Sequence, residues 1–261
     1  MILEAEIFKL YLLVFIRIAG LMVAAPVLGS GNFPVMAKAG LTAMTALLVT
    51  PTILRLDAPL PDEALPFAIM GAGEFLIGLM IGFVMSVVFS AIQVGGQIMD
   101  LQTGFGMMNV FNPALETQFP IFGFFLFILA VLYLLLVNGH HIMLQALIHT
   151  FDADVIPVGT FFVRPELLLE AARWGQVMFV DGLMIAAPIA AAMLLAYITM
   201  GLLGRLIPQI HLFVVGFPLT IAIGLFVTGL IIDVYLGLLD NMFYSMFGSA
   251  DQFIRGMTPA S

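Results

Sequence analysis

The sequence predicts an all-α membrane protein built from helical hairpins. Of its 261 residues, 62% are hydrophobic and only 9% are charged, whereas a soluble domain carries about 25% charged residues. Three stretches contain no Asp, Glu, Lys or Arg, namely residues 75–99, 182–204 and 206–232. Each is long enough for the ~20 residues that a membrane-spanning helix needs. A chain with so few polar residues must be covered by lipid or by apolar partner subunits.

Turn residues divide the N-terminal half into separate hydrophobic segments, and each segment predicts a helix. The first helix is expected over residues 6–28, where Lys9 and Arg17 interrupt the apolar run and argue against a cleaved signal peptide. A turn rich in helix-breaking residues follows at 29–34. The next helices are expected over residues 35–54, 65–99 and 119–137, and a short one ends near residue 151.

The C-terminal half predicts a long helix followed by two shorter ones. Pro165 can open the long helix at its first position, and we expect this helix to reach Gly204 with a kink near Pro188. A turn at residues 207–210 precedes helices expected over 213–232 and 234–253. The loops contain too few Lys and Arg residues to set a membrane orientation.

Several functional classes are excluded by residues that the sequence lacks. There is no cysteine, so neither a disulfide nor a thiolate metal site is possible. The net charge of −8 argues against nucleic-acid binding. His140, His141 and His149 do not follow a known zinc-binding spacing, and there is no nucleophile elbow, zinc-protease motif or P-loop. We therefore expect no enzyme activity, no cofactor and no metal.

Residues 100–118 combine helix-breaking residues with large apolar ones. Gly104, Gly106 and the Asn112–Pro113 pair oppose a regular helix. In a membrane protein, irregular backbone is tolerated only where it is buried in protein or lines a cavity. The segment is therefore either a mobile apolar seal, for which flexible methionine is well suited, or an ordinary buried connection. The apolar residues are Phe105, Met107, Met108, Val110 and Phe111.

Glu74 is a carboxylate within an otherwise apolar helix. At about 100° per residue, Gly71, Gly78 and Gly82 form a narrow stripe, and Glu74 lies within about 60° of it. Stripes of small residues allow helix backbones to approach closely, so Glu74 is expected to face a neighbouring helix. Two roles remain open, because an intramembrane carboxylate can be a functional site or a hydrogen-bonded packing residue.

Several motifs together resemble the FliR family of flagellar type III export-gate subunits, which has relatives in virulence injectisomes. The likeness runs in order over nearly the whole chain, and its last two motifs are the most specific. The motifs are G-E-F-L-I-G at 73–78, G-Q-I-M-D-L-Q at 96–102, N-V-F-N-P at 109–113, N-G-H at 138–140, G-R-L-I-P-Q-I at 204–210 and F-V-V-G-F-P-L at 213–219.

The resemblance implies a non-enzymatic role in the bacterial inner membrane, at the flagellar basal body. In this family, one FliR subunit assembles with several FliP and FliQ subunits into an export gate for unfolded substrates, and FlhB and FlhA lie against that gate. The resemblance also implies a FliP-like part over residues 1–181 and a FliQ-like helical hairpin over 182–261. The hairpin would turn around Arg205, Pro208 and Gln209.

By the same resemblance, the family's plug segment matches residues 104–112. Phe105, Met107, Met108 and Phe111 would then close the pore, and Gly104 and Gly106 would let the segment move aside. The main alternative is a secondary transporter or proton channel that uses Glu74. Transporters often show paired broken helices in matching halves, and the sequence shows no such symmetry. A third class, an intramembrane hydrolase, lacks a nucleophile–base pair.

Overall fold

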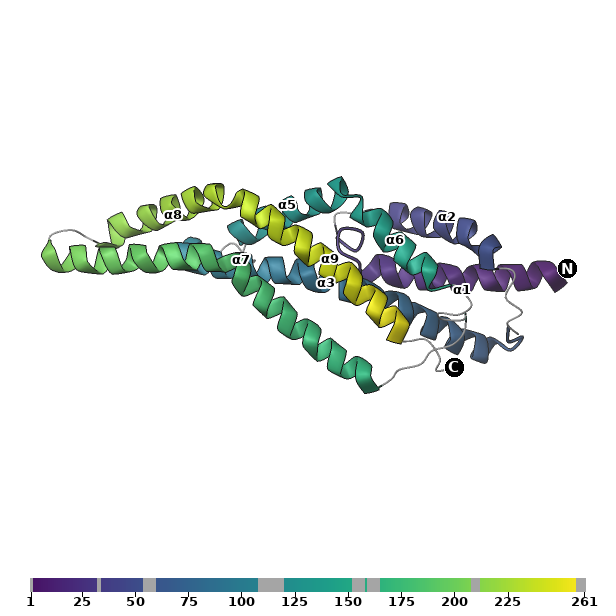
Figure 1. Cartoon of the computed structure of the whole chain (residues 1–261). Helices are drawn as coiled ribbons and strands as arrows, with labels where there is room; N and C mark the ends of the chain where they lie inside the picture. The colour runs from purple at the N-terminus through teal and green to yellow at the C-terminus, as the bar shows by residue number, and fades with distance from the viewer. Residues whose placement is uncertain are drawn as a thin grey trace. The chain divides into compact units, whose positions relative to one another are not determined.

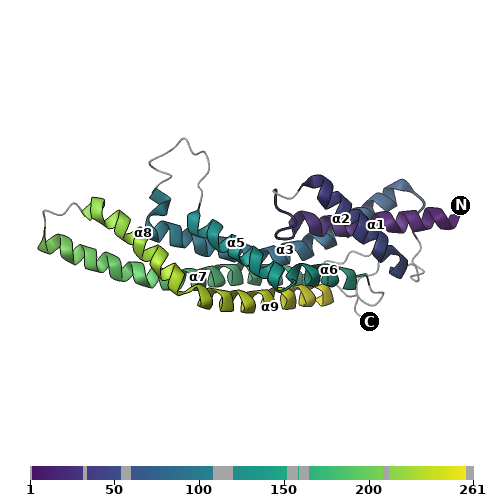
Figure 2. The same ribbon diagram turned by 90° about the horizontal axis from the view of Figure 1, so that it is seen from above.

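The protein is almost entirely helical. The computed structural model describes residues 2–31, 34–53, 60–107, 120–151, 158, 165–207 and 212–256, and Figures 1 and 2 show it from two directions. Within these ranges only short turns and one 3-10 turn interrupt the α-helices, and no strand occurs. The predicted all-α class is therefore confirmed.

Each predicted hydrophobic segment forms a helix. The helices of the N-terminal half are α1 (Ile2–Ala24), α2 (Val35–Ile53), α3 (Ala64–Thr103), the 3-10 turn η1 (Phe105–Met107), α5 (Ile121–Leu136) and α6 (Gly139–His149). Those of the C-terminal half are α7 (Pro165–Leu206), α8 (Leu212–Leu230) and α9 (Ile232–Gly256).

Two predicted helix ends were wrong. The first helix ends at Ala24 and not at Leu28, because Pro26 disfavours helical backbone in the residue before it and Val27 adopts a positive φ of 68°. The third helix continues past residue 99 to Thr103. It ends there because Gly104 adopts a φ of 93°, a conformation that interrupts a right-handed helix. The start of the predicted loop is therefore helical.

The chain forms two compact units. The first unit comprises residues 1–87, 135–174 and 244–261. Its core contains Leu13, Ile18 and Leu21 of α1, which are fully buried, as are Ile81 and Met85 of α3. Further along the chain, the ring of Trp174 meets that of Phe253 edge-on at 5.5 Å. The predicted first-half helices thus share one core with the end of α9.

The second unit comprises residues 88–134 and 175–243. Phe89, Phe127 and Phe243 form an aromatic cluster in its core, with centroids 5.7 Å apart for each pair that includes Phe89. Both views show α7 and α8 running side by side as a hairpin (Figures 1 and 2). Pro188 lies inside α7, and the ribbon of α7 bends part-way along its length in Figure 1, as a proline within a helix predicts.

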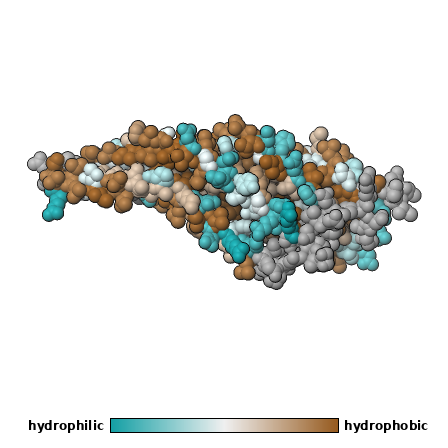
Figure 3. All heavy atoms as spheres, viewed as in Figure 1, coloured by the Kyte–Doolittle hydropathy of each residue, from teal (hydrophilic) through white to brown (hydrophobic). Residues whose placement is uncertain are grey.

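Several helices are long and apolar enough to cross a bilayer. By length and composition, four helices in the described ranges could cross a membrane, and up to six spans arise if each bent helix pair counts as one. One bent pair is α8 and α9, which turn by 62° at Ile231. In Figure 3 a largely hydrophobic face covers α8 and the adjoining part of α7. The protein is an all-α membrane protein.

Candidate functional site

The predicted plug segment begins in a glycine turn with positive φ at the end of α3. Gly104 has a φ of 93°, and a Cβ atom added to it would lie 3.0 Å from the ring of Phe217. Phe105 then starts the 3-10 turn η1, and its ring meets that of Phe122 edge-on at 5.5 Å. Met108, Val110 and Phe111 lie outside the described residues.

The end of α3, next to Gly104, is hydrogen-bonded to α8. Thr220 donates a hydrogen bond from its hydroxyl to the backbone carbonyl of Thr103 at 2.8 Å. A Cβ atom on Gly224 would lie only 2.5 Å from the side chain of Thr103, so the absence of a side chain at Gly224 allows this close approach. The segment that begins at Gly104 therefore starts from a firmly held point.

Glu74 forms a buried ion pair with Arg17 in the first unit. Arg17 Nε and Glu74 Oε2 are 2.5 Å apart, and both side chains are fully buried. Arg17 Nη1 also donates to the carbonyl and the hydroxyl of Thr150, both at 3.0 Å. The guanidinium carbon lies 4.2 Å from the centroid of the Phe151 ring, within the range of a cation–π interaction. Arg17 thus links α1, α3 and the end of α6.

Glycines bring α1 and α3 together around this pair. A Cβ atom on Gly78 would overlap the carbonyl oxygen of Arg17, and one on Gly82 would lie 2.9 Å from the Cβ atom of Ala24. Gly71 is less confined, since its nearest neighbour would be the Ile16 side chain at 3.2 Å. On α1, Gly20 faces the backbone of Phe75 in the same way. The backbones of α1 and α3 therefore lie close enough for the side chains of Arg17 and Glu74 to contact each other directly.

Sequence reasoning missed Arg17 as the partner of Glu74. A signal was available, because an arginine inside an apolar helix needs an acidic or carbonyl partner. Lys9, the other basic residue of α1, is near the surface and donates to Asp62 at 2.7 Å. That hydrogen bond, and then the charge of Lys9, lowers the pKa of Asp62. The two basic residues of α1 therefore form ion pairs with different carboxylates, Lys9 with Asp62 and Arg17 with Glu74.

Of the predicted hairpin-turn residues, the structure describes only Arg205. Arg205 belongs to the last turn of α7, whereas Pro208 and Gln209 lie outside the described residues. The rings of His140 and His141 are 4.4 Å apart. Among the residues that the structure describes, no three His, Asp or Glu side chains gather as a metal site would require.

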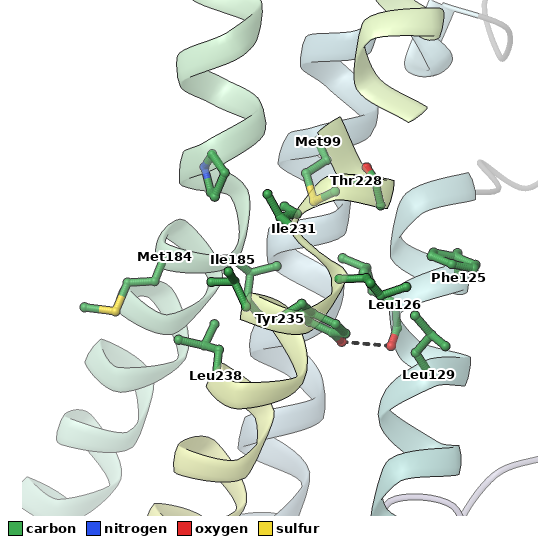
Figure 4. A pocket seen from close by; sticks show the side chains of 13 residues that line it. Met99, Phe125, Leu126, Leu129, Met184, Ile185, Thr228, Ile231, Tyr235 and Leu238 are labelled. Atoms are coloured by element: carbon green, nitrogen blue, oxygen red, sulfur yellow. Dashed lines mark hydrogen bonds between the residues drawn. The ribbon is translucent and has the colours of Figure 1, made fainter. Parts of the chain in front are cut away.

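An apolar cavity lies among α3, α5, α7, α8 and α9 of the second unit (Figure 4). Its lining includes Met99, Met184 and Ile185. Tyr235 points toward α5, and its hydroxyl donates to the carbonyl of Leu126 at 2.9 Å. The cavity presents apolar side chains and a tyrosine whose hydroxyl is already bonded.

A helical membrane protein with a glycine turn at the end of α3 and a buried ion pair fits a transport or export component. Comparison with known proteins identifies the class. Residues 8–246 match the family of "Bacterial export proteins, family 1". Since this match covers most of the sequence, the chain belongs to that family.

Curated relatives specify the branch of the family. The chain is 30% identical to "Flagellar biosynthetic protein FliR" of Bacillus subtilis (strain 168), over 91% of this chain and 92% of the relative. It is 29% identical to the Escherichia coli (strain K12) protein of that name, over 92% and 90%. It is 31% identical to the one from Pectobacterium carotovorum, over 89% and 88%. The resemblance to the FliR family found in the motifs is confirmed.

Proposed function

We propose that this chain is the single-copy core subunit of a flagellar type III export gate. Its membership of the FliR family makes it a component of the flagellar export apparatus. The proposal adds that it forms, with FliP-like and FliQ-like subunits, the channel for unfolded export substrates. FlhB-like and FlhA-like proteins would contact that channel, and the complex would lie in the inner membrane at the basal body.

We further propose that residues 104–112 act as the plug of this channel. The observation that carries the proposal is the backbone at Gly104, whose φ of 93° turns the chain sharply out of α3. Such a conformation is accessible to glycine and strained for other residues. A fixed helix end followed by a glycine turn and apolar residues is the arrangement that a movable hydrophobic seal requires. Hydrophobic constrictions block ion flow by dewetting.

The family relationship also favours a two-part organisation of the chain. We propose that residues 1–181 correspond to a FliP-like part and 182–261 to a FliQ-like hairpin. The apolar α7–α8 hairpin visible in Figures 1 and 2 is compatible with this assignment. A secondary transporter using Glu74 has less support, since the Glu74 carboxylate is fully buried and ion-paired with Arg17.

Deleting residues 104–111 tests the plug. The complex should assemble, and cells that express it should leak ions and small dyes, because the apolar seal is gone. Phe105→Ser should leak in the same direction, more weakly. Conductance or dye uptake measures the leak, and secretion of a flagellar substrate measures export. If the deletion variant assembles and stays as tight as the wild type, residues 104–111 are only a connection.

Gly104→Val supplies a point variant with a matched control. The freedom of glycine alone predicts that β-branched residues at 104 and 106 jam export without leak. The structure changes this expectation for Gly104, because valine at a φ of 93° is strained by about 1–2 kcal/mol and its side chain would press on Phe217. The described turn should therefore weaken, and leak should rise. Gly229→Val is the control, because a side chain at Gly229, also in the second unit, meets open space. It should change neither leak nor export.

A further inference from the structure

Asp100 makes an unusual contact at the base of the proposed plug. It lies in the last turn of α3 and is only 5% exposed. Its Oδ1 accepts a hydrogen bond from the backbone N–H of Phe122 at 3.1 Å, and its Oδ2 accepts one from Gly123 at 3.3 Å. Both donors belong to the first turn of α5. Asp100 thus caps a helix that begins about twenty residues further along the chain.

The capping contact satisfies groups that a helix cannot satisfy by itself. The first N–H groups of an α-helix have no intrahelical acceptor. A carboxylate placed there gains charge-assisted hydrogen bonds and a favourable interaction with the helix dipole. A local cap would come from a residue just before the helix. Here the acceptor comes from α3, so the contact fixes two helices to one another.

Two further contacts bind the same two helix ends. A Cβ atom on Gly96 would overlap the backbone of Gly123, so α3 and α5 touch at this crossing. Phe105, the first residue of η1, packs edge-on against Phe122 at 5.5 Å. The chain that leaves α3 at Gly104 and the chain that enters α5 are therefore held together at the base of the segment.

We infer that Asp100 is a positioning residue for the proposed plug: its carboxylate joins the departing and returning ends of the segment and so fixes the base from which the segment extends. The consequence for leak rests on the proposed plug function, whereas the joining of the two ends does not. Both carboxylate oxygens of Asp100, which precedes the segment, accept hydrogen bonds from backbone N–H groups of Phe122 and Gly123, which follow it. Asp100 makes no contact with substrate and acts through the ends that it joins.

A disulfide between the two ends of the segment, at positions 105 and 122, measures directly how closely Asp100 holds these ends together. The chain has no cysteine, so Phe105→Cys with Phe122→Cys introduces a single thiol pair, at two positions whose rings lie 5.5 Å apart, and its rate of disulfide formation in the assembled export complex reports how closely the two ends are held. The pair should close rapidly under mild oxidation when Asp100 is present. Asp100→Leu should slow closure about tenfold or more, since it removes two charge-assisted hydrogen bonds. Asp100→Asn, which keeps one acceptor oxygen, should give an intermediate rate.

Tyr235→Phe is the matched control. It also removes a buried hydrogen bond to α5, the one to the Leu126 carbonyl, but away from the segment's ends. With Tyr235→Phe added, the cysteine pair at positions 105 and 122 should form its disulfide at the same rate as it does with Tyr235 and Asp100 both present. Complex formation is checked for each variant by co-purification of partner subunits, and Asp100→Asn serves if Asp100→Leu does not assemble.

Leak supplies the second readout. With Phe105 and Phe122 intact, Asp100→Leu should raise dye uptake above the wild-type level, because the two ends of the segment are no longer joined by the carboxylate. Equal rates of closure with Asp, Asn and Leu at position 100 would overturn the inference. Slower closure without leak, together with a tight 104–111 deletion variant, would instead retain the inference about Asp100 and reject the plug.

Discussion

At the scale of single residues, the Arg17–Glu74 pair shows how a charged group is accommodated in an apolar helix. Both side chains are fully buried, Arg17 donates from Nη1 to Thr150, and its guanidinium group lies over the ring of Phe151. Burying two charges is costly, and their attraction offsets the cost only when the geometry is good and the other polar atoms are bonded. The pair therefore specifies how α1 and α3 align more than it adds stability.

Glu74→Gln should destabilise the protein by about 3–5 kcal/mol, because it leaves the charge of Arg17 buried without a counter-charge. The double variant Arg17→Met with Glu74→Leu should lose less than Glu74→Gln, because no charge remains in the core. Thermal unfolding of the purified export complex measures both. If Glu74→Gln leaves the complex equally stable but abolishes export, the carboxylate has a functional role, and the proton-pathway alternative gains support.

At the scale of elements, glycines decide how closely the helices pack. Gly20, Gly78 and Gly82 bring the backbones of α1 and α3 together in the first unit, and Gly96 and Gly123 do the same for α3 and α5 in the second. Close backbone approach increases van der Waals contact, which is the main source of helix association inside a membrane. The same glycines place the charged atoms of Arg17 and Asp100 within reach of their partners.

Gly78→Ala should destabilise the first unit by roughly 1–3 kcal/mol, the usual cost of overpacking, because the added methyl group overlaps the carbonyl of Arg17. Gly175→Ala is the control in another helix, α7, where an added Cβ meets open space. Alanine there should be neutral or stabilising by up to about 1 kcal/mol, since it favours the helix. Thermal unfolding distinguishes the two, and equal effects would show that the α1–α3 packing tolerates a side chain.

At the scale of the whole molecule, many large apolar side chains of the described helices are exposed. In the apolar windows of the candidate spans, 28% of α2 and 28% of α7 are buried, compared with 56% of α3. Exposed side chains include Leu194, Leu195 and Ile198 of α7. Exposed apolar patches of this kind mark contacts with membrane or with other proteins, as the family relationship also indicates.

The chain should therefore be stable only with FliP-like and FliQ-like partners. Co-expression should give one large complex that contains a single copy of this chain, and the chain expressed alone should aggregate or be degraded. Native mass spectrometry of the purified material measures the stoichiometry. A stable homo-oligomer without other subunits would contradict both this expectation and the proposed place in the gate.

The sequence alone was sufficient for the class, the family and most of the helices. Composition and apolar stretches predicted an all-α membrane protein, and the motifs at 73–78 and 204–219 predicted the FliR family. Both predictions are confirmed. The start of the irregular segment was wrong by four residues, because the glycine that ends α3 is Gly104 and the preceding Asp100 remains helical. The roles of the plug residues and of Glu74 stay predictions.

Only the tertiary structure decided which residues act together. Hydrophobicity and helix-breaking residues are local properties, so the order of elements can be derived from neighbouring residues. The partner of Glu74 lies 57 positions away, and the two N–H groups bonded by Asp100 lie 22 and 23 positions away. Such partners depend on which helix faces come into contact, and glycine-mediated packing between distant segments determines those faces. The ion pair of Arg17 and the helix-capping contact of Asp100 therefore became apparent only from the packing of the helices.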